Sequence, residues 1–412
     1  MSDIVSNLQT SLIIQQPNLM TVNLRPHQQE ALNALKVNSI GQCIFPTGGG
    51  KTLVAIMDAV RRFEVNVPRT IVVVCPRILL AEQLSSEFLE HVTNANPLHV
   101  HSGETKHFRT TKSERIKLFV DMCQTVREHV IIFTTYHSLH RIVEAGISVD
   151  TIYFDEAHNS VQRHCYPSVE HYSKKADRCY YFTATRKTSV TPNKPGMNNA
   201  DVYGQIISRV SAPKLVDGGF ILPPKVKVID MAKMPVKSIS PLTDSSNILK
   251  TIDDISIKKI LVAVRTTQQL INLFQTDFAY ELEQRGYDYL YITSKTGAVI
   301  NGKKVSREHF FDVLNSWGKD PDRKFIVLHR SILAEGINVS ELEAVIFLRN
   351  MDVIEMTQTV GRVLRKGGDS KSYGMLCVPV YSNVGVATER ALQRVVDIVF
   401  EKGEVLDSVV RR

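Results

Sequence analysis

The sequence lacks several features that define other classes of protein. No apolar run approaches the roughly 20 residues needed to cross a bilayer, and no basic segment followed by an apolar block stands at the N-terminus. Low-complexity segments and long blocks of lysine or arginine are also missing. These absences argue against a membrane-spanning protein and against a basic tail, and they favour a soluble intracellular chain.

Cysteine is sparse, and its spacing indicates neither a metal site nor a disulfide framework. The six cysteines are scattered, form no C-x-x-C pair, and in several cases stand inside apolar runs: Cys43, Cys75, Cys123, Cys165, Cys179 and Cys377. This usage is typical of small core side chains in a reducing compartment, which we expect to be the cytoplasm or the nucleus.

Length and charge limit the possibilities further. The chain has 412 residues, of which 43% are hydrophobic, and this suits two domains of roughly 150–200 residues each. Lysine and arginine number 50 against 42 acidic residues, for a net charge of +8. Such a balance favours a polyanionic partner. A mildly basic, solvated surface is the alternative.

Two sets of short, Val- and Ile-rich runs predict two doubly wound domains with parallel sheets. The first set is 42–45, 70–75, 130–134, 151–154 and 179–182; the second is 259–264, 289–292, 324–328, 344–348 and 374–378. Amphipathic stretches such as 267–284 and 307–317 separate the strands. Gly218–Pro224 and a polar, Ser-rich stretch interrupt the pattern. We therefore expect an N-terminal domain over 1–220, a linker over 221–250 and a C-terminal domain over 251–412.

A glycine-rich segment after the first predicted strand indicates a phosphate site. It consists of Thr47, Gly48, Gly49, Gly50, Lys51 and Thr52, and an apolar, helix-like segment follows. Glycines let backbone N–H groups approach the phosphates of ATP, the lysine reaches the outer phosphates, and the threonine hydroxyl is a ligand for Mg²⁺. Phe45 stands where this pattern usually has a small residue. We interpret its side chain as facing the core.

Two adjacent carboxylates follow the strand predicted over 151–154. Asp155 is placed to hold the other side of the Mg²⁺ ion, and Glu156 to orient and deprotonate the attacking water. Because ligands of open α/β sheets bind at the carboxyl ends of the strands, both carboxylates are expected at the ATP site.

A third group of residues near the C-terminus contains two arginines. Arg362 and Arg365 are three residues apart, which predicts that they share one face of a helix. Guanidinium groups of a second domain, carried to the γ-phosphate, would stabilise the charge that develops during phosphoryl transfer. The alternative is a surface helix with two solvated arginines.

Taken in order along the chain, these motifs resemble those of the superfamily 2 helicases, in particular the DEAH-box group that includes excision-repair and restriction-enzyme motor subunits. The resemblance covers nearly the whole chain. It implies two tandem RecA-like domains with ATP in the cleft between them, and it implies that Gln28 contacts adenine, with Arg25 beside it.

The resemblance also implies roles for residues outside the phosphate site. Pro76, Arg77, Thr135 and Tyr136 match segments that contact the nucleic-acid strand, and His158, Thr183, Thr185 and Gln358 match segments that couple it to the ATP site. Gly336 and Asn338 match a nucleotide-contacting motif in which the family usually has Asp at the second position, so the role of Asn338 is open. For Tyr136, stacking on a base and filling the core are equal alternatives.

The leading hypothesis is an ATP-driven motor that moves along nucleic acid and unwinds it, with DNA favoured over RNA by the resemblance. Contacts with the phosphate backbone suit such stepping because they carry no sequence information. An ATP-gated clamp or remodeller that does not unwind is the alternative, and a phosphate-loop enzyme without a nucleic-acid partner is a third. The small size suits a virus or mobile element and an accessory protein that supplies specificity.

Overall fold

The computed structural model describes residues 22–191, 194–231, 241–264, 266–293, 295–330, 341–348, 351–366, 371–380 and 385–409. Their contacts divide the chain into two units. Of the described residues, the first unit holds 22–45, 50–210 and 407–409, and the second holds 46–49 and 211–406. The motif that contains Gly336 and Asn338 lies outside the described residues.

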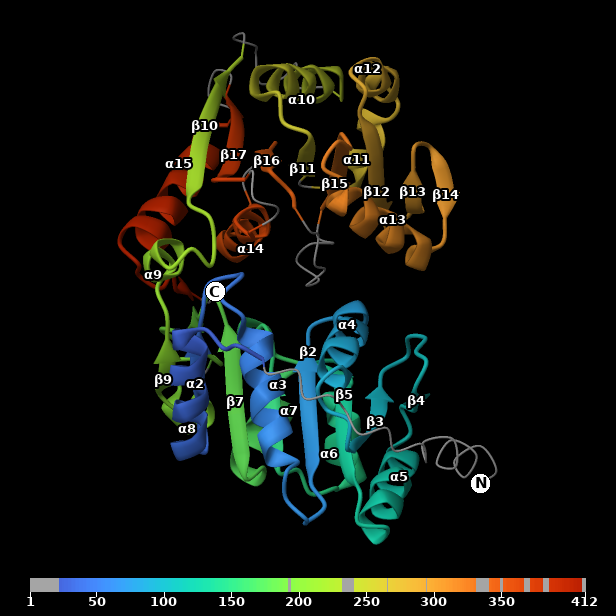
Figure 1. Ribbon diagram of the computed structural model, residues 1–412, viewed down its shortest axis with the longest axis vertical. Coiled ribbons are helices and arrows are strands. Elements are labelled where there is room, and N and C mark those ends of the chain that lie inside the picture. The colour runs from blue at the N-terminus through green and yellow to red at the C-terminus, as the bar shows by residue number, and fades with distance from the viewer. Residues whose placement is uncertain are drawn as a thin grey trace. The chain divides into compact units, whose positions relative to one another are not determined.

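The first unit is built on an eight-stranded sheet in the order β4-β3-β5-β2-β6-β7-β1-β9 (Figure 1). Its strands are β1 (Ile40–Ile44), β2 (Thr70–Cys75), β3 (Ala95–Val100), β4 (Phe108–Arg109), β5 (His129–Thr135), β6 (Thr151–Phe154), β7 (Arg178–Thr183) and β9 (Ile206–Arg209). Every pairing in this sheet is parallel. The carboxyl ends of the strands therefore lie along one edge, as expected for a doubly wound sheet.

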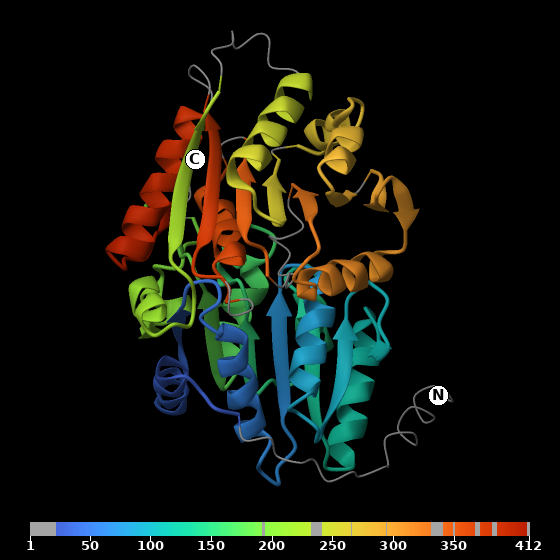
Figure 2. The same ribbon diagram turned by 45° about the horizontal axis from the view of Figure 1, so that its top comes forward.

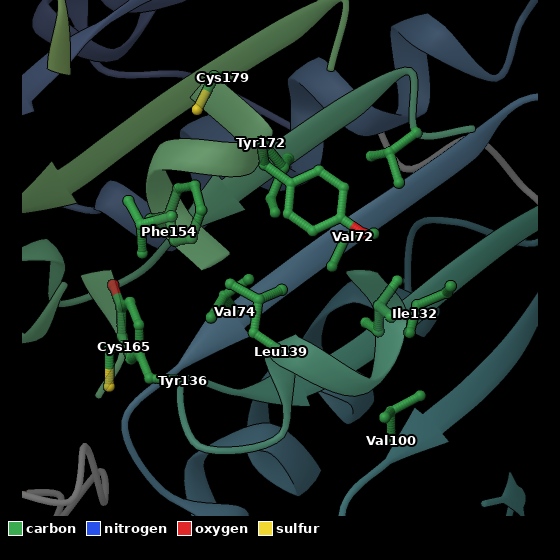
Figure 3. Close-up of a cluster of buried hydrophobic side chains, with 14 of the residues drawn as sticks. Val72, Val74, Val100, Ile132, Tyr136, Leu139, Phe154, Cys165, Tyr172 and Cys179 are labelled. Atoms are coloured by element: carbon green, nitrogen blue, oxygen red, sulfur yellow. The ribbon is translucent and has the colours of Figure 1, made fainter. Parts of the chain in front are cut away.

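Helices cover both faces of this sheet, as Figure 2 shows. They are α2 (Pro26–Val37), α3 (Lys51–Arg62), α4 (Ile78–Leu89), α5 (Ser113–Thr125), α6 (Leu139–Ala145), α7 (Tyr166–Lys175) and α8 (Ala200–Tyr203). On one face Phe154 and Ile132 join Leu139 and Tyr172 in a buried apolar cluster (Figure 3). On the other face Tyr153 contacts Phe88 of α4. Adjacent residues of a strand thus pack into opposite layers.

The second unit contains another eight-stranded sheet, in the order β10-β17-β16-β11-β15-β12-β13-β14. Its strands are β10 (Pro224–Asp230), β11 (Lys259–Ala263), β12 (Asp288–Thr293), β13 (Gly297–Ile300), β14 (Lys303–Val305), β15 (Phe325–His329), β16 (Ala344–Phe347) and β17 (Gly374–Val380). The pairings from β10 to β12 are parallel, whereas β12–β13 and β13–β14 are antiparallel. The predicted parallel α/β architecture is confirmed for both units.

The helices of the second unit are α9 (Ala212–Asp217), α10 (Pro241–Ile255), α11 (Thr267–Leu273), α12 (Phe278–Gln284), α13 (Arg307–Lys319), α14 (Val353–Val363) and α15 (Val386–Val395), which continues as a π-helix, η4 (Val396–Glu401). After it the chain returns to the first unit, where β18 (Ser408–Val409) pairs in parallel with β8 (Lys187–Thr188). The first unit is therefore assembled from separate parts of the sequence.

The division of the chain differs from the expected linker over 221–250. Within that stretch, β10 is the edge strand of the second sheet, and α10, which begins there, packs against the neighbouring strand β17. The main stretch of the first unit ends at Val210, and that of the second unit begins at Ser211. Lys225 and Lys227 alternate with valines along β10. Because an edge strand tolerates such polar residues, its sequence resembles a loop.

All six cysteines are buried and free, in accord with their prediction as core residues. No helix in the described part of the chain is both long and apolar enough to cross a membrane.

A buried ion pair ties α3 to the first sheet. Asp58 is fully buried and lies 2.7 Å from Nε of Arg62, whose side chain is only 6% exposed. The hydroxyl of Tyr153 donates to the same carboxylate at 2.7 Å, and Arg62 donates to the hydroxyl of Tyr180 at 3.1 Å. Each buried charge is thus neutralised and hydrogen-bonded, which is the condition for burying it at all.

We expect Asp58→Ala to lower the free energy of unfolding by about 3–5 kcal/mol, because it leaves the Arg62 guanidinium buried without its counter-ion. The matched control is Asp121→Ala, which breaks an exposed pair with Lys117 and should cost less than about 1 kcal/mol. Urea unfolding followed by far-UV circular dichroism measures both. Equal stabilities of the two variants would contradict the prediction.

Candidate active site

The predicted phosphate loop joins the end of β1 to the start of α3. Gly48 and Gly50 have φ angles of 85° and 79°, in the left-handed region that glycine adopts without strain. The N–H of Gly49 donates to the carbonyl of Pro46 at 2.9 Å, which closes the turn. The loop ends at the N-terminus of α3, where free N–H groups and the helix dipole favour a bound phosphate.

Lys51 and Thr52 form the first turn of α3, beneath this loop. Lys51 is 9% exposed, and its amino group donates to the carbonyl of Phe45 at 3.4 Å. Both residues line a small pocket together with Asp155. Phe45 itself is fully buried and packs edge-on against His27, so the interpretation that it faces the core is confirmed.

Asp155 follows directly after β6 and is held by its backbone. Its N–H donates to the carbonyl of Val74 at 2.8 Å, and its carbonyl accepts a hydrogen bond from the hydroxyl of Tyr136 at 2.9 Å. Burial and the adjacent Glu156 carboxylate raise the pKa of Asp155, while Lys51 acts to lower it. A divalent cation would supply the positive charge that this carboxylate needs, and Mg²⁺ prefers oxygen ligands such as those of Asp155 and Thr52.

Glu156 adopts an unusual backbone conformation, with φ of 46° and ψ of 53°. A non-glycine residue in this left-handed region stores strain, and such strain is found at functional sites. The conformation begins the short 3₁₀ helix η1 (Ala157–Asn159). Oε2 of Glu156 lies 3.4 Å from Nδ1 of His158, so the candidate base is close to a second titratable group.

His158 bridges Glu156 and the end of β7. Its Nδ1 lies 3.2 Å from Oγ1 of Thr183, and the Thr183 hydroxyl donates to the carbonyl of Thr185 at 2.9 Å. Asn159 places its amide nitrogen 3.1 Å from Nε2 of the same imidazole. Since the amide donates to Nε2 and Thr183 accepts, the network assigns the imidazole proton to Nδ1. Of the predicted coupling residues, His158, Thr183 and Thr185 are thus brought together in the first unit, whereas Gln358 belongs to the second.

Gln28 lies against the last glycine of the phosphate loop. Its side-chain oxygen accepts from the N–H of Arg25 at 2.9 Å, and its amide nitrogen donates to the carbonyl of Gly50 at 3.3 Å. A Cβ at residue 50 would come within 2.1 Å of that nitrogen. Gly50 is therefore needed both for its φ angle and for its contact with Gln28.

The predicted strand-contact residues divide into two groups. Pro76 and Arg77 follow β2, and Thr135 ends β5 beside it, since Cys75 and Thr135 are paired in the sheet. Arg77 is exposed. Tyr136, in contrast, is 3% exposed and stacks on Phe154 with ring centroids 6.0 Å apart. Of its two alternatives, the structure supports packing in the core, because the ring has no free face for a base.

Sequence reasoning missed a pair of exposed imidazoles near Arg77. His137 and His164 stack with ring centroids 4.3 Å apart, and both are exposed. Partial burial, His164 and the charge of Arg77 lower the pKa of His137. The residues are 27 positions apart in the sequence, so only the fold brings them together.

In the second unit, the arginines predicted to share one helix face differ in their surroundings. Gln358, Gly361 and Arg362 lie on α14, and Arg362 is 4% exposed. The helix ends at Val363, so Arg365 falls beyond it and forms a bridge with Ile221. Lys371 donates to the carbonyls of Val363 and Arg365, at 2.6 and 3.1 Å. This lysine caps the helix and fixes the backbone at Arg365.

His329, at the end of β15, lies close to Arg362. It is buried, and burial together with the arginine's charge lowers its pKa to about 3. The imidazole is therefore neutral at physiological pH and adds no positive charge beside Arg362.

Comparison with known proteins shows what the sequence and the fold resemble. Residues 21–188 match the family model described as type III restriction enzyme, res subunit. The ATP-dependent type ISP restriction-modification enzyme LlaBIII, bound to DNA, has 18% identity and a TM-score of 0.73 over 97% of this chain and 32% of its own. No curated protein matches the sequence.

Two further structures share the fold over most of both chains. The Hef helicase domain of Pyrococcus furiosus has 13% identity and a TM-score of 0.53, over 90% of this chain and 98% of its own. Dbp5 of S. cerevisiae, bound to RNA and ADP BeF3, has 15% identity and a TM-score of 0.57, over 93% and 89%. The chain spans about a third of the length of the type ISP enzymes that it matches. At these identities the shared feature is the fold of tandem RecA-like domains.

Lys51→Ala and Glu156→Gln should both abolish ATP hydrolysis but differ in ATP binding. Loss of Lys51 removes a phosphate contact and should weaken affinity, whereas Glu156→Gln keeps the phosphate and metal contacts and should hold ATP unhydrolysed. Titration calorimetry with ATP and a phosphate-release assay measure the two effects. The assigned roles would be refuted by equal losses of affinity.

Gln28→Ala should relax the preference for ATP over GTP, since an amide both donates to and accepts from the adenine edge. The ratio of kcat/KM for the two nucleotides measures the effect. Gln29→Ala is the matched control, because Gln29 is exposed. If the ratio is the same in wild type and Gln28→Ala, the residue does not read the base.

Proposed function

We propose that this chain, which has the fold and the ATP-site residues of a superfamily 2 helicase-like enzyme, hydrolyses ATP to move along nucleic acid. The observation that carries the proposal is the connected set of Glu156, His158 and Thr183. The carboxylate of Glu156 lies 3.4 Å from the imidazole of His158, and that imidazole is hydrogen-bonded to Thr183 at the end of β7. Loss of the γ-phosphate near Glu156 would therefore shift the carboxyl ends of the strands in the first sheet. Arg77 follows one of these strands, β2.

The exposed Arg77, with His137 and His164, supplies a surface for the phosphate backbone. Arginine forms strong, charge-assisted hydrogen bonds with phosphate oxygens, and the imidazoles offer faces for stacking. Contacts of this kind do not distinguish bases, so one step can repeat along any sequence. The net charge of +8 supports the same partner.

DNA is the proposed substrate, in preference to RNA. The type ISP restriction enzymes LlaBIII and LlaGI have the higher TM-scores among the compared structures, 0.73 and 0.66, and both are complexes with DNA or a DNA mimic. Dbp5, in complex with RNA, scores 0.57. Those enzymes are about three times longer than this chain. We propose that a partner protein supplies sequence specificity.

An ATP-gated clamp that does not move is the second candidate. Glu156 and the two arginines favour the motor, because a clamp needs ATP binding but no rapid hydrolysis. We propose Mg²⁺ as the cofactor, held by Thr52 and Asp155. In the proposed cycle Arg362 and Arg365 act on the γ-phosphate only when nucleic acid is bound.

The test compares ATP hydrolysis alone with hydrolysis in single- and double-stranded DNA and RNA at low salt. We expect stimulation that is strongest with DNA. A triplex-displacement assay on duplex DNA and a strand-displacement assay then separate movement without unwinding from unwinding. Hydrolysis that no nucleic acid stimulates would refute a nucleic-acid motor, and stimulation without displacement in either assay would favour the clamp.

Arg362→Ala and Arg365→Ala should lower DNA-stimulated turnover by about 10³-fold or more while ATP affinity stays within a few fold, because such arginines act on the transition state. The exposed Arg394 on α15 provides the control variant. Turnover at saturating ATP and DNA is the measurement. A variant that keeps its stimulated rate removes that arginine from the mechanism.

A further inference from the structure

A histidine- and glutamate-rich cluster lies outside the ATP site, between α4 and the end of β3. Glu82 stands on α4, and His99 and His101 stand at the end of β3 and just after it. Alternate residues of an extended chain share a face, so the two imidazoles project to the same side of the sheet. Helix α4 covers that side and places the carboxylate of Glu82 beside both imidazoles.

The three side chains converge on one point. Nδ1 of His99 and Nε2 of His101 lie 3.0 Å apart, and each lies 3.2 Å from Oε1 of Glu82. The imidazoles are fully buried, and Oε1 is buried without a hydrogen bond of standard geometry. A four-coordinate zinc ion with bonds of about 2.0 Å holds its ligand atoms roughly 3.3 Å apart. The observed triangle matches that spacing.

We propose that Glu82, His99 and His101 bind a divalent transition metal, with Zn²⁺ as the best match. Two imidazoles and one carboxylate are ligands that zinc accepts, whereas Mg²⁺ and Ca²⁺ prefer oxygen alone. Three protein ligands leave a fourth position for water. The proposal does not rest on ATP hydrolysis, since none of the three residues belongs to the phosphate site.

The carboxylate faces two ring nitrogens. Burial acts to raise the pKa of Glu82, but hydrogen bonds with His101, His99 and Thr105 lower it overall. A charged carboxylate beside two ring nitrogens attracts a cation strongly.

Neighbouring groups orient the ligands. Oγ of Ser85, one turn beyond Glu82 on α4, lies 3.0 Å from Nε2 of His99. It can accept the ring proton and so free Nδ1 for the metal, as in many zinc sites. His101 requires one adjustment, because the N–H of Gly103 donates to its Nδ1 at 3.2 Å. Binding through Nε2 needs a proton on Nδ1, so that contact must open.

A metal at this position would link α4 to the segment after β3. Gly103 already packs on Ile78, the first residue of α4, where a Cβ would come within 2.3 Å of Cγ2. Since Ile78 follows the exposed Arg77, the metal would hold the helix that begins at the proposed strand-contact edge. Its role is structural, and its removal should loosen α4 without removing an ATP ligand.

The experiment uses the full chain without an affinity tag. The protein is stripped with a chelator, dialysed against a small excess of Zn²⁺, and its metal content is measured by mass spectrometry. We expect about one zinc ion per chain in the wild type. Glu82→Gln, His99→Gln and His101→Gln should each lose it, whereas His140→Gln, a change of an exposed histidine, should keep it. Ser85→Ala should weaken zinc affinity by about 10- to 100-fold.

Cobalt provides a measurement that needs no variant. Titration of the stripped wild-type chain with Co²⁺ should produce the visible absorption of a four-coordinate ion, and Zn²⁺ should abolish it. Zinc should also raise the melting temperature of the wild type and of His140→Gln but not of His101→Gln. A wild-type chain that retains no stoichiometric zinc and gives no cobalt spectrum would overturn the proposal, as would equal zinc content in all variants. In that outcome the cluster is a hydrogen-bonded network only.

Discussion

The parallel pairing of β2, β6, β7 and β1 decides where the groups of the candidate ATP site lie. These strands are neighbours in the sheet, and their carboxyl ends carry in turn Arg77, Asp155, Thr183 and the phosphate loop. One shift of register along β6 would exchange the two faces of the strand and move Asp155 away from Lys51. The chemistry of the site thus depends on buried strands that contain no catalytic residue.

The buried strands were predictable from the sequence because they are continuous runs of valine, isoleucine and aromatic residues. Strand β2 has the predicted bounds, and β5 and β7 differ from theirs by one residue at each end. The strands at the β4 end of the first sheet were not predictable. β3, which pairs with the edge strand β4, contains Asn96 and Pro97, and such residues are depleted in strands. The stretch 267–284 forms two helices, α11 and α12, and between them Thr276 accepts a hydrogen bond from the N–H of Phe278, the first residue of α12.

The phosphate-site residues were predicted from their order and chemistry, whereas the residues that contact and support them were not. Nothing in the sequence indicates that Gln28 contacts Gly50, that Lys371 caps α14, or that His164 stacks on His137. Each of these contacts joins residues from different elements, and a local pattern carries no information about such neighbours. For the same reason the sequence could not decide between base stacking and core packing for Tyr136. Its burial depends on neighbours such as Phe154, which are distant in the sequence.

The strand pair β8–β18 gives the first unit a discontinuous sequence. Residues up to Val210 form most of it, yet its last strand is supplied by Ser408 and Val409, after the whole second unit. A fragment that stops at Val210 would therefore fold with an unpaired strand and would lose the pair formed by Arg186 and Asp407. A first unit produced by itself therefore keeps this strand pair only if residues 407–409 are joined to it.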